Sequence, residues 1–561
     1  MRRGGNGWSG VESLLVLAGI AVLLAIAGCG DDDDSQTGGE TLAASCSAGP
    51  CDLVIVDGRV VDPLTSTDRT AAVGIQDGRI DVIESSPEAV SDLVASAARV
   101  IDADGLVVAP GFINIHGHEA DVEGTTMVSV RDGITTYIGG NCGSLPWLGD
   151  PVPAQDFFAS VEAAGLYTNY AAYTGHNTLR LRSGVPDAMT PATQEQIAQM
   201  VEMAAQDLAA GALGVSYGPF YHPGAAYEEM IALAVKSAEL GGGDAIHVRY
   251  ALPLPDPGLP VAALNEGIQL ATESGVPLLI SHEGGPLLGA GSAGTGAEFI
   301  FRGLEEGVNL GSDMISGWPF GVTSILAPVF LEPPYVPWMI DELIEMLGNP
   351  ITDWAVVKSV IIDGAVYMQA GEHFDSLEEF RYVRDTVFAG AAEDPNVTYG
   401  YVFKEYWYAL WLSLPFVMVE TDSYVARDPA TGEYVAAPWV AGNFAHFWGY
   451  WIREGQLCNL STAVYKTSTL AALWLGLDKK GRVQVGCDAD LVLFDPDTIM
   501  DANLLANPVS LEPPVGIPYV IVNGELVVDQ GELSGSKPGQ MIRRTWTVPG
   551  QMPGPWQQQQ D

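Results

Sequence analysis

Apolar segments of strand length alternate with helical patterns through the middle of this chain, and this alternation constrains its fold most strongly. Helical spacing of apolar residues occurs at 193–210, 227–240, 261–274 and 295–307. The apolar runs lie at 111–118, 134–140, 169–174, 212–217, 243–248, 277–282, 307–312 and 415–421. Eight parallel strands joined by helical crossovers form a (β/α)8 barrel. The sequence therefore predicts an α/β fold of this kind, a TIM barrel, over residues 111–475.

Strand-like segments around Asp-Gly and Asn-Gly pairs lie near both chain ends, and such pairs are typical of β-hairpin turns. The pattern occurs in 53–62 and 73–84, which each read as two strands around an Asp-Gly turn, in 489–495, and in 519–528 with an Asn-Gly turn. We expect one small β-domain assembled from residues 52–110 and 476–545. The residues that follow, 546–561, are expected to form a disordered tail.

The segment 326–414 interrupts the alternating pattern before the last strand-like run. It is too long for an ordinary connector and is rich in Trp and Tyr. We read it as an inserted lid or substrate-pocket segment. An ordinary helical decoration of the barrel is the alternative.

The chain is strongly acidic, with 70 Asp and Glu residues against 25 Lys and Arg residues and a formal net charge of −45. Such a surface repels phosphate backbones, which argues against a nucleic-acid partner. A hydrophobic content of 47% and a charged content of 17% also exclude a disordered chain. The composition is that of a folded protein that does not bind nucleic acid.

The first residues have the pattern of a secretory signal peptide. Arg2 and Arg3 precede an apolar run, 14–27, which is shorter than the roughly 18 to 20 residues that a membrane span needs. The run leads into Ile-Ala-Gly-Cys, which resembles a bacterial lipobox. We therefore expect cleavage of the signal peptide, 1–28, and lipidation of Cys29. An ordinary cleaved signal and a membrane anchor are the alternatives.

This start predicts an exported lipoprotein on the periplasmic or cell-surface face, which touches the membrane only through its lipid anchor. Residues 29–51 carry four Asp followed by small polar residues and are expected to form a flexible acidic tether. Within it, Cys46 and Cys51 flank a short Ser-Ala-Gly-Pro turn. In an exported protein this spacing favours a local disulfide.

Histidines close several of the predicted barrel strands. His116 and His118 end the first strand, His247 and His282 end two later ones, and Asp422 follows the last. Residues i and i+2 of a strand share a side, so both imidazoles of the His-Gly-His motif can enter the barrel mouth. Because TIM barrels build their active sites at the carboxyl ends of strands, these side chains are predicted to meet there.

Ordered motifs around these residues resemble a known family. The stretch 107–118 (VVAPGFINIHGH) is similar to the first metal-binding motif of the amidohydrolase superfamily. Four further stretches resemble its N-acyl-D-amino-acid deacylase, or D-aminoacylase, branch: 133–143 (GITTYIGGNCG), 175–180 (GHNTLR), 211–218 (GALGVSYG) and 481–495 (GRVQVGCDADLVLFD). The similarity extends from about residue 52 to residue 545.

The resemblance implies a barrel with a small β-domain and a zinc site that has one tight position and a second, weaker one. Carried over residue by residue, the tight position matches Cys142, His247 and His282, and the second matches His116, His118 and Asp422. Asp422 also matches the family's proton shuttle. The residue chemistry agrees, because zinc prefers thiolate, imidazole and carboxylate ligands and brings the pKa of its water to near 7. A carboxylate beside that water can take its proton and return it to the departing amine.

His176 and Tyr217 lie in family motifs and are the candidate substrate contacts, with a structural hydrogen bond as the alternative for His176. Two basic groups of the family are absent, because 281–284 reads SHEG in place of Ser-His-His-Lys and 437–439 reads APW in place of His-Pro-Arg. Arg249, two residues after His247, is the candidate replacement that would bind a substrate carboxylate. A neutral amide, cyclic amide or peptide-like substrate is the alternative.

The sequence therefore predicts a zinc-dependent hydrolase of non-peptide C–N bonds, most like an N-acyl-D-amino-acid deacylase and acting on a small-molecule amide. Another amidohydrolase activity, on cyclic amides or D-dipeptides, is the first alternative. A non-catalytic lipid-anchored binding protein is the second.

Overall fold

The computed structural model describes residues 45–47, 49–249, 258–282, 292–316, 358–362, 365–372, 405–428, 431–437, 439–502 and 510–550. They belong to one compact unit. Cys29, the predicted signal peptide and most of the predicted insertion 326–414 lie outside these residues, so those predictions remain open. Within the described part of the chain, no helix has the length and apolar character needed to cross a bilayer.

Parallel strands separated by helices form the middle of the chain. Six of them are ordered β16-β13-β12-β11-β10-β9, and three more are ordered β6-β7-β8. Their bounds are β6 Phe112–Asn114, β7 Ile134–Gly139, β8 Asn169–Ala172, β9 Thr174–Gly175, β10 Val215–Tyr217, β11 Asp244–Ile246, β12 Leu278–Ile280, β13 Leu310–Ile315 and β16 Val417–Glu420. Each of the eight predicted runs overlaps at least one of these strands, and the run 169–174 overlaps both β8 and β9. This is a TIM-barrel-like α/β fold.

Helices lie between these strands in the order that the sequence pattern predicts. The four helices expected from periodicity are confirmed as α5 Gln194–Ala209, α6 Tyr227–Glu239, α7 Gly258–Ser274 and α8 Ser292–Glu305. Capping explains the start of α5, where the Thr193 side chain accepts a hydrogen bond from the Gln196 backbone and the Gln196 side chain accepts one from the Thr193 backbone. The other helices in this part of the chain include α2 Val122–Arg131, α3 Ala154–Ala164, α4 His176–Arg182, α12 Glu405–Ser413, α13 Asn443–His446, α14 Leu460–Val464 and α15 Leu470–Leu475.

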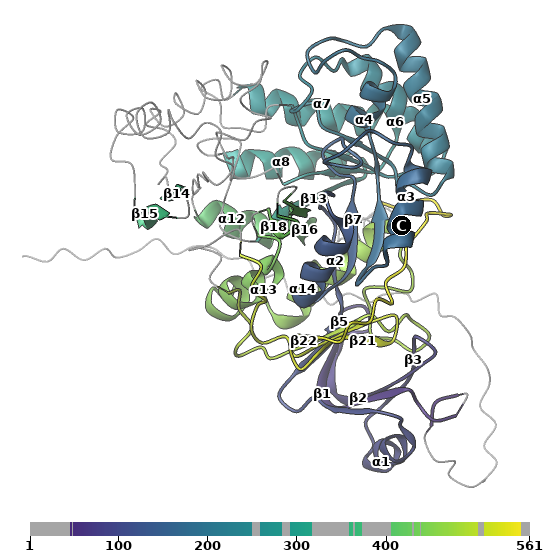
Figure 1. Cartoon of the computed structure of the whole chain (residues 1–561), viewed down its shortest axis with the longest axis vertical. Coiled ribbons are helices and arrows are strands. Elements are labelled where there is room, and N and C mark those ends of the chain that lie inside the picture. The colour runs from purple at the N-terminus through teal and green to yellow at the C-terminus, as the bar shows by residue number, and fades with distance from the viewer. Residues whose placement is uncertain are drawn as a thin grey trace, which may run out of the picture. The chain divides into compact units, whose positions relative to one another are not determined.

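A nine-stranded sheet joins the two ends of the chain (Figure 1). Its order is β22-β21-β20-β19-β5-β1-β2-β3, with β4 beside β1. The strands are β1 Leu53–Asp62, β2 Thr67–Gln76, β3 Arg79–Glu84, β4 Val100–Asp102, β5 Val107–Pro110, β19 Leu491–Phe494, β20 Tyr519–Val522, β21 Glu525–Asp529 and β22 Glu532–Leu533. The junction between the two ends is the antiparallel pair β5–β19. Two predicted turns, at 77–78 and 523–524, connect β2 to β3 and β20 to β21 as expected.

The prediction of two strands within 53–62 is wrong. These residues form the single strand β1, with an irregularity between Ile55 and Gly58 where it pairs with β2. Asp57 takes a left-handed conformation there, with φ 60°. Pairing with β2 continues on both sides, so the Asp-Gly pair forms a bulge and not a hairpin turn. A Cβ atom on Gly58 would lie 2.5 Å from Val108 Cγ2, which explains the glycine.

Both predicted flexible ends are too long. Cys46 and Cys51 form the expected disulfide and are buried in an apolar cluster with Val54 and Leu93, so the tether ends before Cys46. At the other end, residues 546–550 are held by hydrogen bonds. The Val548 N–H donates to the Gly241 carbonyl, and the Gly550 N–H donates to the Trp474 carbonyl. The first part of the predicted disordered tail therefore packs on the connection between α6 and β11 and on α15.

Candidate metal centre

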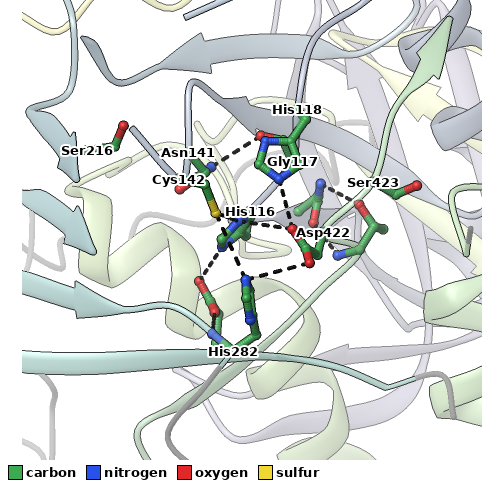
Figure 2. Close-up of polar contacts among 12 residues, drawn as sticks. His116, Gly117, His118, Asn141, Cys142, Ser216, His282, Asp422 and Ser423 are labelled. Carbon is green, nitrogen blue, oxygen red and sulfur yellow. Dashed lines mark hydrogen bonds and ion pairs between the residues drawn. The ribbon is translucent and has the colours of Figure 1, made fainter. Parts of the chain in front are cut away.

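Four potential metal ligands from four separate strand ends converge on one place (Figure 2). His116 follows β6, Cys142 follows β7, His282 follows β12 and Asp422 follows β16. One ligand atom from each of these residues lies within 4.8 Å of each of the others. Because the four strands are parallel, their carboxyl ends face the same way and bring together residues up to 306 positions apart.

The distances between these donor atoms are short. Cys142 Sγ lies 3.3 Å from His116 Nε2 and 4.0 Å from His282 Nε2. Asp422 Oδ1 lies 2.8 Å from His118 Nε2 and 3.3 Å from His116 Nε2. Asp422 Oδ2 lies 3.6 Å from His282 Nε2. Donors at about 2.0–2.3 Å from a tetrahedral zinc ion are separated by roughly 3.3–3.8 Å. The donor types fit zinc, and three of these five separations lie within this range, with the Cys142–His282 pair slightly wider and the Asp422–His118 pair closer.

His247, the sixth predicted ligand, is next to this cluster. It follows β11, and its ring packs edge-on against His282 with centroids 5.0 Å apart. The rings of Phe220 and Tyr221 also pack against the His247 ring, with centroid distances of 4.8 and 4.9 Å. The structure thus places all six predicted ligands together, five through donor-atom contacts and His247 through its ring contact with His282.

Two of the candidate ligands have an unusual backbone. Cys142 has φ 53° and Asp422 has φ 43°, both in the left-handed region that side chains with a Cβ atom avoid. Such a residue costs of order 1–3 kcal/mol, and surrounding structure has to stabilise it. At Asp422 that support comes from the neighbouring strand, because its N–H donates to the His116 carbonyl at 3.1 Å.

Burial and mutual charge set the protonation of the cluster. Burial raises the pKa of Asp422, but the hydrogen bonds from His116 and His118 and the positive charge of His116 outweigh it, so the pKa ends well below its usual range. Burial also lowers the pKa of His282 well below its usual value. An ionised carboxylate and a neutral imidazole are the forms that bind a metal ion.

His116 behaves differently from His282. Burial lowers its pKa, but the charges of Cys142 and Asp313 outweigh burial and raise it well above the usual value. A metal ion that bound Nε2 of His116 would therefore take the place of a proton.

Asp313 is a functional candidate that the sequence reading missed. It lies on β13, where its Oδ2 atom is 3.2 Å from His116 Nδ1 and its Oδ1 atom accepts a hydrogen bond from the His282 N–H at 2.5 Å. It therefore orients one candidate ligand from each metal position, as carboxylates behind metal-binding histidines commonly do. The available signal was an acidic residue next to an apolar strand-like run, 307–312.

Glu119 was also missed. It follows His118 directly, is fully buried, and its Oε1 atom accepts hydrogen bonds from the Tyr170 hydroxyl at 2.7 Å and from the Gly140 N–H. Burial raises the pKa of Glu119 to about 7. It thus connects the end of β6 to the loop that carries Cys142.

The three predicted substrate contacts have their hydrogen-bond partners outside the cluster. The Tyr217 hydroxyl donates to Asp244 Oδ2 at 2.9 Å. His176 Nε2 lies 3.3 Å from Glu229 Oε2, and both side chains are fully buried.

Arg249 is paired as well. Its guanidinium contacts Glu266 at 3.0 Å and donates to the carbonyls of Pro223 and Ala225, each at 2.8 Å. The positive charge that was expected to meet a substrate carboxylate is therefore already balanced by Glu266.

Comparison with known proteins gives three consistent results. Residues 416–527 match the model of the amidohydrolase family. The chain is 31% identical over 528 residues to N-acyl-D-glutamate deacylase from Alcaligenes xylosoxydans xylosoxydans, covering 89% of this chain and 98% of that protein. It is 27% identical over 526 residues to D-aminoacylase from the same organism, covering 88% and 98%.

Solved structures agree with the sequence relatives. N-acyl-D-glutamate deacylase from Bordetella bronchiseptica, solved with zinc and a phosphonate inhibitor that mimics the tetrahedral intermediate, superposes with a TM-score of 0.70 at 27% identity and covers 88% of this chain and 100% of that chain. A D-aminoacylase structure described for its binuclear metal centre gives the same values. D-hydantoinase, at 16% identity and a TM-score of 0.53 over 89% of this chain and all of that one, shares the fold.

Proposed function

The chain belongs to the amidohydrolase family, in its N-acyl-D-amino-acid deacylase branch, and on this premise we propose that it is a zinc-dependent hydrolase of non-peptide amide bonds in N-acyl-D-amino acids or closely related amides. The observation that carries the proposal is the cluster of His116, Cys142, His282 and Asp422, whose donor types and spacing fit zinc. The non-catalytic binding protein is disfavoured, because such a protein has no need of a complete ligand set.

The six candidate ligands divide between two metal positions. Cys142, His247 and His282 would hold the tight zinc ion, and His116, His118 and Asp422 would form the second position. When bound, zinc supplies Lewis-acid chemistry that activates water and polarises the scissile carbonyl. Asp313 connects the two positions, because its carboxylate contacts His116 of the second and accepts a hydrogen bond from the His282 N–H of the first.

Asp422 is the candidate proton shuttle. Its two carboxylate oxygens lie against the Nε2 atoms of His116, His118 and His282, so it is placed between the two positions. There it would accept the proton of the attacking water and deliver it to the amine that leaves as the amide bond breaks. The Asp422 N–H contact with the His116 carbonyl holds the carboxylate in this place.

The finer architecture is also a proposal. We propose that the parallel strands close into a (β/α)8 barrel over 111–475 and that residues 52–110 and 476–545 form a separate small β-domain. Contacts between the ends of β6 and β16 support closure, because Thr421 N–H donates to Asn114 Oδ1 at 2.9 Å and the Asn114 amide donates to Thr421 Oγ1 at 3.0 Å. The β5–β19 pair supports the shared domain.

We further propose that the mature protein begins at lipidated Cys29 and lies outside the cytoplasm. The support is the basic, apolar and lipobox-like order of the first 29 residues. Substituting Cys29→Ala should release the protein from the membrane fraction. Unchanged membrane association would favour a spanning anchor.

A hydrolysis screen with zinc added tests the function. We expect the fastest release of free amine from N-acyl-D-amino acids, with slower cleavage of their L-enantiomers. D-dipeptides and cyclic amides are included because the family's Lys and His-Pro-Arg groups are absent. A preference for cyclic amides would reassign the substrate class, and no hydrolysis of any member by the zinc-loaded protein would contradict the proposal.

A further inference from the structure

The loop that carries Cys142 has a backbone conformation that its own residues do not favour. Gly140, Cys142 and Gly143 have φ values of 73°, 53° and 85°, so three of four consecutive residues are left-handed. Glycine adopts this conformation freely, but Cys142 does not. The position of the Cys142 sulfur atom therefore depends on contacts that hold the loop from outside.

One hydroxyl group spans this loop. Ser216, on β10, donates from Oγ to the Gly140 carbonyl at 2.5 Å and accepts at the same atom from the Gly143 N–H at 3.1 Å. The two partners are the residues on either side of Asn141 and Cys142. Ser216 is fully buried, so water does not replace these bonds easily. In Figure 2, Ser216 lies on the opposite side of the loop from Asp422.

Other contacts hold single residues of the same loop, including the Asn141 amide, which donates to the Ile138 carbonyl at 3.3 Å. The Gly140 N–H donates to Glu119 on one side. On the other side, the Gly143 carbonyl accepts from the Asn177 N–H at 2.7 Å, and a Cβ atom on Gly143 would lie 2.7 Å from the Gly218 nitrogen. These contacts, and the bond from the Asn177 side-chain amide to the Cys142 carbonyl at 3.4 Å, each hold one residue of the loop, whereas Ser216 fixes the separation of Gly140 and Gly143.

We propose that Ser216 is a positioning residue that presents the Cys142 sulfur to His116 and His282 by bridging Gly140 and Gly143. The inference rests on the proposed zinc site and adds to it a residue that contacts no candidate ligand side chain. Partners behind metal ligands typically change metal affinity by about 10- to 100-fold when they are removed. Ser216→Ala should therefore weaken zinc binding by about that factor.

The test uses the purified full chain loaded with Zn²⁺ or with Co²⁺, whose sulfur-to-metal charge-transfer absorption reports a bond to thiolate. We expect Ser216→Ala to lower zinc affinity, measured by chelator competition, by about 10- to 100-fold and to weaken or shift the cobalt–thiolate band. Ser216→Thr, which keeps the hydroxyl, should recover most of both signals.

Ser468→Ala is the matched control. Ser468 is also fully buried, and its Oγ atom donates to the Gly111 carbonyl at 2.7 Å, away from the Cys142 loop. It should lose thermal stability like Ser216→Ala but keep zinc affinity and the cobalt band. If Ser216→Ala does not fold, Ser216→Cys, whose larger thiol forms weaker hydrogen bonds, should also lower zinc affinity, measured by chelator competition.

The outcomes separate the two proposals. Wild-type affinity and an unchanged band in Ser216→Ala would overturn the positioning role, as would an equal loss in Ser468→Ala. A wild-type protein without stoichiometric zinc or without a cobalt–thiolate band would instead contradict the proposed metal site itself.

Discussion

The barrel-like region and the nine-stranded sheet treat buried polar groups differently. In the sheet the buried interior is mainly apolar, with residues such as Ile55, Leu491 and Ile521 packed together. Its buried carboxylate, Asp62, accepts a hydrogen bond from the Val483 N–H at 2.7 Å. Over the described residues, the buried side-chain polar atoms that have no hydrogen-bond partner in the protein all lie between residues 118 and 474. Examples are the Tyr173 hydroxyl and both carboxylate oxygens of Glu420.

Left-handed backbone follows the same division. In the sheet it occurs at turns and the bulge, at residues such as Asp57, Asp77 and Asn523, whose short polar side chains tolerate it well. In the barrel-like region it occurs at the candidate metal ligands Cys142 and Asp422, and also at Trp439 and Gln456. The comparison teaches that left-handed backbone in the sheet suits the local residue types, whereas at Cys142 the surrounding structure has to stabilise it to place a candidate ligand.

Removal of the Cys142 sulfur should have the largest effect on zinc binding and hydrolysis. In Cys142→Ala the tight position keeps two imidazoles and no thiolate, so we expect stoichiometric zinc to be lost and hydrolysis to fall by at least about 1,000-fold. Metal analysis and steady-state rates check this, and the circular dichroism spectrum should stay unchanged. Full zinc content with a wild-type rate would remove Cys142 from the ligand set.

Asp422→Asn should separate metal binding from proton transfer. The amide cannot accept the proton of water, so kcat should fall by about 100- to 10,000-fold while the tight zinc ion is largely kept. Rates and zinc content are measured on the same sample. If this variant keeps its rate, another group must serve as the proton acceptor.

A core substitution in the sheet should lower the stability of the protein but leave its zinc content and kcat nearly unchanged. Ile521 is fully buried on β20, and Ile521→Ala should lower the free energy of unfolding by about 2–5 kcal/mol. Zinc content and kcat of the folded protein should remain within a factor of about two. Chemical denaturation measures the free energy of unfolding, metal analysis measures the zinc content, and steady-state rates measure kcat. A matching loss of kcat would show that the two regions are tightly coupled.

The smallest effect concerns substrate charge. In Glu266→Gln, Arg249 loses its ionic partner but can keep its hydrogen bonds to the carbonyls of Pro223 and Ala225. If Arg249 binds the substrate carboxylate, KM for N-acyl-D-amino acids should fall by about 3- to 10-fold, because one competing carboxylate is gone. The control substrates are the same compounds with the carboxylate converted to a carboxamide, and their KM should not change. An unchanged KM for both would argue that Arg249 has a structural role.

Five of the six candidate ligands could be predicted from the sequence because each follows a recognisable apolar strand and because strand ends of a parallel barrel share one side. Cys142 was predicted from the family resemblance. His116 and His282 needed no knowledge of distant contacts. The pairing of Arg249 could not be predicted, since Glu266 lies 17 residues later on α7 and any nearby carboxylate satisfies the same charge. For the same reason Asp313 was missed, because its partners are 197 and 31 residues away.

The sequence by itself determined the order of strands and helices, the turns at 77–78 and 523–524, the local Cys46–Cys51 disulfide and the chemical types of the metal ligands. These properties depend on hydrophobic periodicity, on turn residues and on side-chain chemistry, which act over a few neighbouring residues. Tertiary structure alone decided that Asp57 forms a bulge, that Glu266 balances Arg249 and that Ser216 bridges the Cys142 loop. Each of these depends on a partner supplied by another element, and the partner is fixed only when the chain packs.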